Sequence, residues 1–124
     1  VLADAGIYMG IVSNKDGALL REEVAYLGWG QFFGAIVGAN DTVRAKPAPE
    51  PLHLSLEPGS ITAGREVWFV GDTDIDMECA IAGGVVPVLL REKPPETGEF
   101  DEFSPELRFT NGENFCAFLE LAGN

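Results

Sequence analysis

Residues 67–84, VWFVGDTDIDMECAIAGG, decide the predicted fold class. The four apolar residues 67–70 predict a buried strand, and a glycine that allows a tight turn follows them directly. In the rest of the stretch Ile75, Cys79 and Ala82 recur at helical spacing, so that they share one side of a helix. A strand followed closely by a helix is the building unit of a parallel sheet covered by helices. The stretch therefore predicts an α/β fold.

The same alternation extends to both sides of this stretch. Apolar runs bounded by Gly, Asn, Asp or Pro predict further strands at residues 7–12, 35–37, 85–90 and 107–109. Helical patterns predict helices at residues 16–27, 49–56 and 74–82, and a last helix that Asn111 could cap. The sequence thus predicts a Rossmann-like parallel sheet flanked by helices.

The composition limits the classes of partner. The chain has 124 residues, 46% of them apolar, which suffices for one modest core. Its 20 acidic and 8 basic residues give a formal charge of -12, which repels nucleic acid and anionic membrane surfaces. No apolar stretch reaches the roughly 20 residues of a membrane span. Cys79 and Cys116, with a single histidine, indicate neither a disulfide framework nor a zinc cluster, and we expect buried thiols in a reducing cytoplasm.

Three aspartates at alternate positions, Asp72, Asp74 and Asp76, follow the predicted strand. Like charges repel and carboxylates are costly to desolvate, so this grouping needs a physical reason. A calcium-binding loop would need glycine where Met77 stands and glutamate where Gly83 stands, so the sequence departs from that pattern.

A solvated helix start is a second interpretation. Acids in a first turn favour the helix dipole, and Thr73 or Asp74 could cap the backbone amides. This accounts poorly for Asp72, which stands at the very end of the strand. A hard divalent cation explains Asp72 and Asp76 together, because their oxygens could reach one magnesium ion directly or through water.

Other polar residues follow the other predicted strands. Ser13 and Asn14 end the strand at residues 7–12, and Lys46 precedes a proline-rich helix start, where free amides favour an anion. Taken singly, Ser13 could be a turn residue and Lys46 an exposed lysine. In parallel sheets, however, ligands bind beyond the carboxyl ends of the strands, so we expect the side chains of Ser13 and Asn14 to converge with Asp72.

Three motifs in this order resemble the haloacid dehalogenase (HAD) superfamily, particularly its phosphoglycolate phosphatase-like members. The motifs are IVSNK at residues 11–15, KPAPEP at residues 46–51 and the stretch at residues 67–84. The resemblance covers about residues 7–90, and the last motif is the most specific. It implies a HAD-type core and a magnesium-dependent phosphatase that hydrolyses a small phosphorylated metabolite through an aspartyl-phosphate intermediate.

The resemblance also implies a role for each matching residue. Ser13 is similar to the hydroxyl that hydrogen-bonds the transferring phosphoryl group, with Asn14 beside it. Lys46 is similar to the cation that stabilises phosphoryl charge and the aspartyl nucleophile. Asp72 is similar to the magnesium ligand, and Asp76 to its companion, which binds the metal through water or orients Lys46. Such chemistry rests mostly on positioning and charge stabilisation.

Part of the family pattern is missing. The family's nucleophile is the first aspartate of an Asp-x-Asp motif after a central strand, whereas Asp4 has no strand before it and Gly6 stands two positions later. We therefore expect an incomplete sheet without its central first strand, no cap domain, and a missing N-terminal segment that is needed to complete the site. We expect one partial core domain over residues 1–124, and no turnover from this chain alone.

Within that domain, four segments are expected. These are a helix end or linker at residues 1–6, the motif-bearing core at residues 7–90, a solvated acidic loop at residues 91–106, and a terminal strand and helix at residues 107–124.

Alternative functions stay open at this point. A phospho-acceptor receiver domain has a similar fold, but its acidic pair comes first and its lysine last, the reverse of the order here. Phosphomutases and dehalogenases share the HAD framework, although magnesium-type aspartates disfavour a dehalogenase. A catalytically dead binding module or a truncated, non-functional fragment is the alternative outside enzymes. The upstream coding sequence discriminates these, because an Asp-x-Asp after an apolar strand supports the enzyme.

Overall fold

The structure is a computed structural model of the chain and describes residues 6–122, with side chains described up to residue 117. A helix end or linker is predicted at residues 1–6, and residues 1–5 of it lie outside the described part. The chain forms two compact units, Val1–Ala63 and Gly64–Asn124, which are described separately below. The assignment of all 124 residues to one partial domain stays a prediction.

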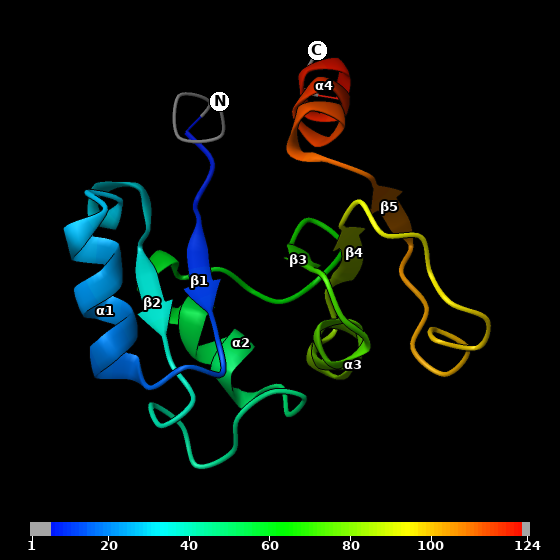
Figure 1. The fold of residues 1–124 in the computed structure, drawn as a ribbon. Helices are drawn as coiled ribbons and strands as arrows, with labels where there is room; N and C mark the ends of the chain where they lie inside the picture. The colour runs from blue at the N-terminus through cyan, green and yellow to red at the C-terminus, as the bar shows by residue number, and fades with distance from the viewer. Residues whose placement is uncertain (1–5, 123–124) are drawn as a thin grey trace. The chain divides into compact units, whose positions relative to one another are not determined.

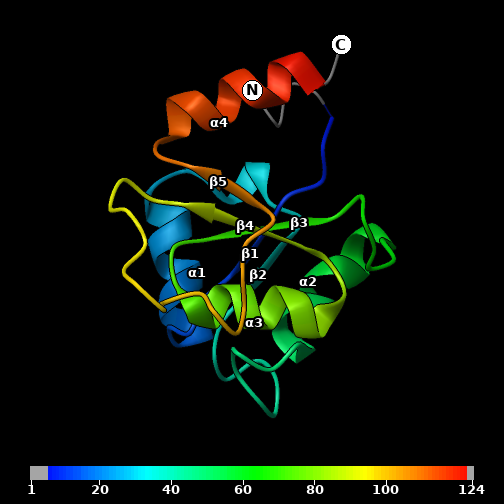
Figure 2. The same ribbon diagram turned by 90° about the vertical axis from the view of Figure 1, so that its right-hand side faces the viewer.

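The first unit is a pair of parallel strands between two helices. Strand β1 (Gly10–Val12) pairs with β2 (Ala35–Val37), with Gly10 opposite Ala35. Helices α1 (Gly17–Tyr26) and α2 (Glu50–Leu56) flank the pair from opposite sides (Figures 1 and 2). Two short 3₁₀ helices, Gly30–Phe32 and Glu57–Gly59, lie between these elements in the chain. Its buried apolar side chains include Leu20, Val24, Val37, Pro51, Leu52 and Leu56.

The second unit is a three-stranded parallel sheet in the order β3-β4-β5. Its strands are β3 (Trp68–Gly71), β4 (Val86–Leu90) and β5 (Leu107–Phe109). Helices α3 (Asp74–Gly83) and α4 (Gly112–Ala122) lie on opposite sides of this sheet (Figures 1 and 2). Strand β4 has a neighbour on each side and is buried over its first four residues, as expected for a central strand of a parallel sheet. The core of the unit contains Met77, Leu89 and Phe100, with Phe103 packed against it.

The predicted fold class is confirmed, including the incomplete sheet. Within residues 6–122, β1 pairs only with β2, and β3 only with β4. The strand predicted at residues 7–12 is shorter than expected, because its partner β2 begins only at Ala35. Asn111 caps α4 as predicted, since its side chain accepts a hydrogen bond from the Asn114 N–H at 2.8 Å.

Two predictions from composition have different outcomes. Cys79 is buried as expected, whereas Cys116 on α4 is partly exposed, so the prediction for Cys116 is wrong. Among the described residues, neither cysteine belongs to a disulfide. None of the described helices is long and apolar enough to cross a membrane. The cytoplasmic location stays a prediction.

Candidate functional site

Ser13 and Asn14 follow β1 directly in the first unit. The Ser13 N–H donates to the Val37 carbonyl at 3.0 Å, which extends the β1–β2 pairing by one residue, and the Ser13 hydroxyl oxygen accepts the Lys15 N–H at 3.1 Å. The Asn14 side-chain amide donates to the Lys46 carbonyl oxygen at 3.2 Å. The structure therefore brings Asn14 and the Lys46 backbone together, although 32 positions separate them in the chain.

Lys46 lies in a turn before α2 and is partly buried. Helix α2 begins only at Glu50, with Pro49 at its N-cap position and no side-chain cap, so Lys46 precedes the helix instead of lying at its first turn. The peptide bond between Lys46 and Pro47 is cis. Arg44 holds the same loop to the helix through two hydrogen bonds to the Glu50 carboxylate, at 2.7 and 2.9 Å.

The loops after β1 and β2 contact each other backbone to backbone. A Cβ added to Gly38 would lie 2.3 Å from the Gly17 Cα. The two loops could therefore not come this close if residue 38 had a side chain. The Gly17 N–H donates to the Asn40 Oδ1 at 2.8 Å, and the Gly38 N–H donates to the Asp41 carboxylate at 2.7 Å. Arg21 pairs with Asp41 at 2.8 Å and lowers the pKa of that carboxyl group. These contacts hold both loops in one arrangement.

Asp72 and Asp76 meet at the end of β3 in the second unit. Asp72 is exposed, whereas Asp76 is 6% exposed. The Asp76 Oδ2 accepts two hydrogen bonds, from the Asp72 N–H at 3.1 Å and from the Thr73 hydroxyl at 3.2 Å. The buried carboxylate thus fixes the turn that carries the exposed one.

Gly71 makes room for this arrangement. A Cβ at position 71 would lie 2.3 Å from the Asp76 Cβ and 2.5 Å from its Oδ2, which is closer than real Cβ atoms come to other atoms. The absence of a side chain at the last residue of β3 is therefore a condition for the buried position of Asp76.

Thr73 is the N-cap of α3, because its side chain accepts the Asp76 N–H at 3.4 Å. The capping role predicted for Asp74 is wrong, since the helix begins one residue after Thr73 and places Asp74 in its first turn. There Asp74 is exposed, and its negative charge interacts favourably with the positive end of the helix dipole.

The donors of the second unit fit a hard divalent cation in part. Magnesium prefers carboxylate oxygens and keeps several waters, so one or two protein carboxylates can suffice on the protein side. Among residues 6–122 no group of three or more His, Cys, Asp and Glu side chains could hold a metal ion. The Asp76 Oδ2 already accepts two hydrogen bonds, whereas the Asp72 side chain is exposed, so of the two carboxylates that of Asp72 is the more accessible to a cation.

The predicted site residues thus form two groups, one in each unit. Ser13, Asn14 and Lys46 belong to the first unit, and Asp72 and Asp76 to the second. The convergence of the two groups on one ligand stays a prediction, as do the individual catalytic roles.

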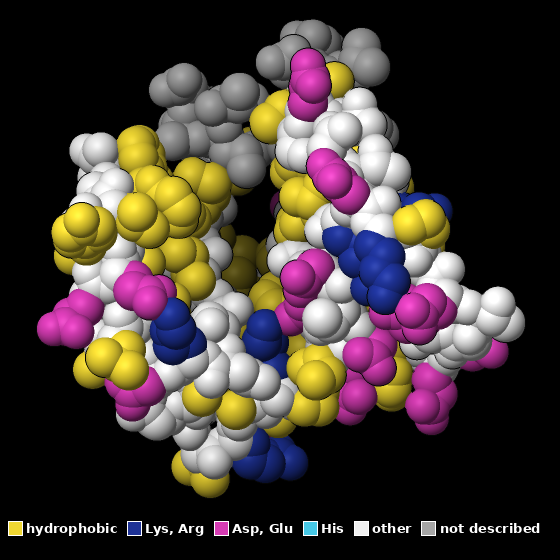
Figure 3. Space-filling model, viewed as in Figure 1, with side chains coloured by type: hydrophobic (Ala, Val, Ile, Leu, Met, Phe, Trp, Pro, Cys, Tyr) yellow, Lys and Arg dark blue, Asp and Glu magenta, His cyan; other side chains and the backbone are white. Residues whose placement is uncertain are grey.

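Arg91, which follows β4, was not predicted from the sequence as a site residue. Its guanidinium donates to the Asp72 carbonyl oxygen at 2.9 Å. The available signal was its position at the carboxyl end of a buried strand, the same edge of the sheet at which Asp72 stands. Acidic side chains are numerous on the face of the second unit that Figure 3 shows.

Comparison with known proteins identifies relatives over most of the chain. A family model of haloacid dehalogenase-like hydrolases matches residues 1–89. A phosphoglycolate phosphatase of Pectobacterium atrosepticum is 39% identical over 83 residues, which are 67% of this chain and 35% of that protein. A phosphoglycolate phosphatase of Escherichia coli K12 is 33% identical over 79 residues, or 64% of this chain and 31% of that protein.

Solved structures give the same family. A HAD-superfamily hydrolase from Ehrlichia chaffeensis is 32% identical, with a TM-score of 0.86 over 99% of this chain and 54% of the other. A HAD-superfamily hydrolase of subfamily IA from Geobacter sulfurreducens is 25% identical, with a TM-score of 0.73 over 94% of this chain and 53% of the other. The chain therefore spans about a third of the length of the curated relatives and about half of the solved ones. From the family match and the fold together, the chain belongs to the haloacid dehalogenase-like hydrolases.

Proposed function

We propose that this chain carries part of the active site of a magnesium-dependent phosphatase, which hydrolyses small phosphate monoesters through an aspartyl-phosphate intermediate. The observation that carries the proposal is the pair of carboxylates after β3. Asp72 is exposed at the strand end while the buried Asp76 fixes its backbone N–H. The phosphoglycolate phosphatases among the relatives support a small phosphorylated metabolite as the substrate class.

The residues of this chain bind and orient in the proposed reaction. The Ser13 hydroxyl and Asn14 bind the phosphoryl group, and the Lys46 ammonium offsets its negative charge, which this acidic chain would otherwise repel. Asp72 holds the magnesium ion, with Asp76 as its companion. When bound, magnesium neutralises charge on the transferring phosphoryl oxygens.

The nucleophile of the proposed reaction lies outside this chain. No Asp-x-Asp precedes β1 in the printed sequence, and the proposal therefore places the attacking carboxylate and the general acid and base outside these 124 residues. We propose that an N-terminal segment supplies them, together with the central strand that the two separate sheets lack. The isolated chain then has no phosphatase turnover.

A hydrolysis assay with para-nitrophenyl phosphate, with and without magnesium, tests the proposal. We call the chain joined to the segment that precedes it in its gene the extended protein. The assay compares this chain, the extended protein, and the extended protein with Asp72→Asn or Lys46→Ala. We expect activity only in the magnesium-loaded extended wild type, and a loss of turnover on the order of 100-fold in each variant.

The assay has two outcomes that contradict the proposal. Magnesium-dependent turnover by the rigorously purified chain alone would show that no external nucleophile is needed. No turnover by a folded extended protein would favour a binding role. Chelation of magnesium should abolish the activity of the extended wild type, and circular dichroism checks that each variant is folded.

A further inference from the structure

We propose that Arg91 is a positioning residue, which fixes the backbone of Asp72 so that its carboxylate is held ready for a divalent cation. The proposal rests on the proposed function, because it takes Asp72 as the ligand. It adds the segment that follows β4 to the site, a segment whose acidic composition predicts a solvated loop.

Arg91 is held on several sides. Its side chain is 14% exposed, and its guanidinium lies over the Phe100 ring, 5.1 Å from the ring centroid. Nε donates to the Lys93 carbonyl at 3.0 Å, and one terminal nitrogen donates to both the Asp72 carbonyl at 2.9 Å and the Glu99 carboxylate at 2.8 Å. The other terminal nitrogen donates to Glu99 at 2.5 Å. A guanidinium fixed in this way offers its donor to Asp72 in one direction only.

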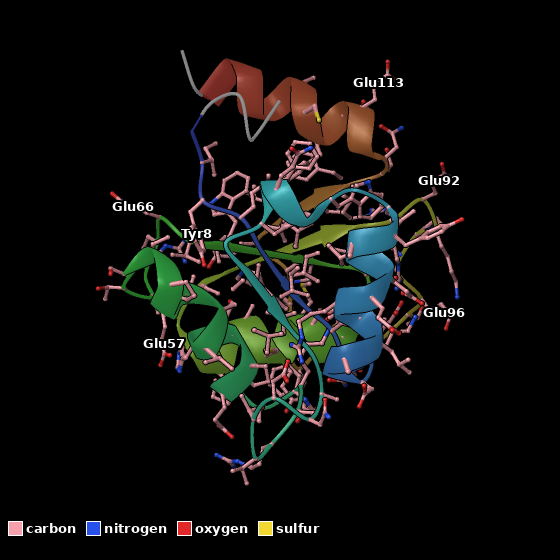
Figure 4. The ribbon with its side chains drawn as sticks, turned by 90° about the vertical axis from the view of Figure 1, so that its left-hand side faces the viewer. Tyr8, Glu57, Glu66, Glu92, Glu96 and Glu113 are labelled. Carbon is pink, nitrogen blue, oxygen red and sulfur yellow. The ribbon has the colours of Figure 1, made fainter. Side chains whose placement is uncertain are left out.

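The partners of Arg91 are themselves anchored. The Glu99 carboxylate also accepts the Glu96 N–H at 3.0 Å. Phe100 is buried in the core cluster of the unit, beside Met77, the residue that follows Asp76 in α3. In Figure 4, by contrast, the labelled side chain of Glu96 points outward, and it is exposed. The segment is therefore solvated along its outer side and fixed at Glu99 and Phe100.

Arg91 and Asp76 together hold both polar groups of the Asp72 backbone. The Asp72 N–H donates to the Asp76 carboxylate, and the Asp72 carbonyl accepts from Arg91. Backbone direction determines where a side chain can point, so these two bonds limit the positions of the Asp72 carboxylate. Hydrogen bonds of this kind, one shell away from a metal, orient the ligand and contribute to metal affinity.

Glu99 offsets the charge of Arg91 within the same pair, which reduces the repulsion between the guanidinium and a cation at Asp72. The hydrogen bond to Glu99, and also the charge of Asp72, raise the pKa of Arg91. Replacing Glu99 by glutamine would leave the guanidinium uncompensated beside Asp72. We therefore expect Glu99→Gln to weaken cation binding through charge, and Arg91→Lys to weaken it through lost geometry.

The test measures Mn²⁺ binding to the extended protein by the electron paramagnetic resonance signal of free Mn²⁺. The variants are Arg91→Lys and Glu99→Gln, and the matched control is Arg65→Lys. Arg65 pairs with Glu106, which makes a second arginine–glutamate pair in the same unit, away from Asp72. We expect Arg91→Lys to bind Mn²⁺ about 10-fold more weakly and Arg65→Lys to bind as the wild type does. In the hydrolysis assay, Arg91→Lys should need more magnesium for half-maximal turnover while keeping most of kcat at saturation.

Each outcome decides a different claim. If Arg91→Lys and Glu99→Gln bind Mn²⁺ like the wild type, Arg91 only anchors the loop and this inference is overturned. If Arg91→Lys does not fold, Glu99→Gln decides by the same measurement. If the wild type does not bind Mn²⁺, or Asp72→Asn binds it equally well, Asp72 is no ligand, and the proposed function fails together with this inference.

Discussion

Asp72 and Asp76 are the same residue type four positions apart, and the fold gives them opposite surroundings. A carboxylate as buried as that of Asp76 is costly unless hydrogen bonds compensate it, and the Asp72 N–H and Thr73 hydroxyl supply two. Asp72 stays exposed and keeps its carboxylate available. One aspartate therefore organises the turn, and the other keeps its carboxylate exposed to solvent.

The first prediction concerns Gly71. We expect Gly71→Ala to destabilise the protein by roughly 1–3 kcal/mol and to lower the affinity for a divalent cation, because the new methyl group would displace Asp76. Urea unfolding and Mn²⁺ titration of the extended protein check both effects. Gly64→Ala is the matched control, since nothing lies within 4 Å of a Cβ at that position. Equal stability and affinity in the two variants would contradict the role of Gly71.

For single residues, the sequence indicated which residues belong to the candidate site better than what each of them does. Asp72 and Asp76 were recognisable from their spacing, and the structure brings them together. Thr73 and Asp74 are both competent caps, and only the end of β3 at Gly71 decides between them. The contact between Arg91 and Asp72 joins positions 19 residues apart, so the only signal for it was that both residues follow the ends of neighbouring strands.

At the scale of elements, the start of α3 links the helix to the site. Thr73 caps the helix and also donates its hydroxyl to the Asp76 carboxylate. The cap and the turn that carries Asp72 therefore share one side chain.

We expect Thr73→Ala to cost about 1 kcal/mol of unfolding free energy through loss of the cap. Cation affinity should fall as well, because Asp76 loses a hydrogen-bond donor. Thr73→Ser keeps the hydroxyl and should restore both quantities. Denaturant unfolding and Mn²⁺ titration are the measurements, and a serine variant as impaired as the alanine variant would show that the methyl group, and not the hydroxyl, matters.

The Arg91–Glu99 pair predicts a pH dependence. Two hydrogen bonds, the larger contribution from Arg91 and the smaller from the Glu96 N–H, lower the pKa of Glu99 from 4.5 to about 2. A depressed folded-state pKa means that the stabilisation is fully present above about pH 4.5 and is lost as the pH falls toward 2. The stability difference between the wild type and Glu99→Gln should therefore shrink over this interval. Urea unfolding at several pH values measures it, and a constant difference would contradict the pairing.

The lengths of elements were predictable where local sequence sets them. Strands at residues 35–37 and 107–109 have the predicted bounds, and α3 begins at the predicted residue. Strand β1 is shorter than predicted because the number of paired residues depends on β2, which is distant in the chain. The anchoring of the segment after β4 was missed for the same reason. Its acidic composition indicates solvent, whereas Phe100 is buried, Phe103 packs against the core and Glu99 bonds to Arg91.

At the scale of the whole molecule, each sheet has an open edge. Among the described residues, the edge of β1 away from β2 and the edge of β3 away from β4 carry no strand. Apolar side chains are exposed at these strands, with Val70 in β3 39% exposed and Ile7 before β1 48% exposed. Unpaired strand edges are templates for pairing with other chains.

We expect the isolated chain to self-associate as its concentration rises, and the extended protein to do so much less. Sedimentation velocity over a range of concentrations measures both. A chain that stays monomeric at all concentrations would show that the open edges are protected without a further strand.

The close approach of Gly17 and Gly38 has a consequence for how the first unit moves and evolves. A side-chain contact can adjust by rotamer changes, but two backbones in contact have no such freedom. The loop that carries Asn14 and the loop that leads to Lys46 should therefore shift as one rigid body when a ligand arrives. Insertions in either loop would have to be matched by the other, so we expect the two loops to vary in length together among relatives.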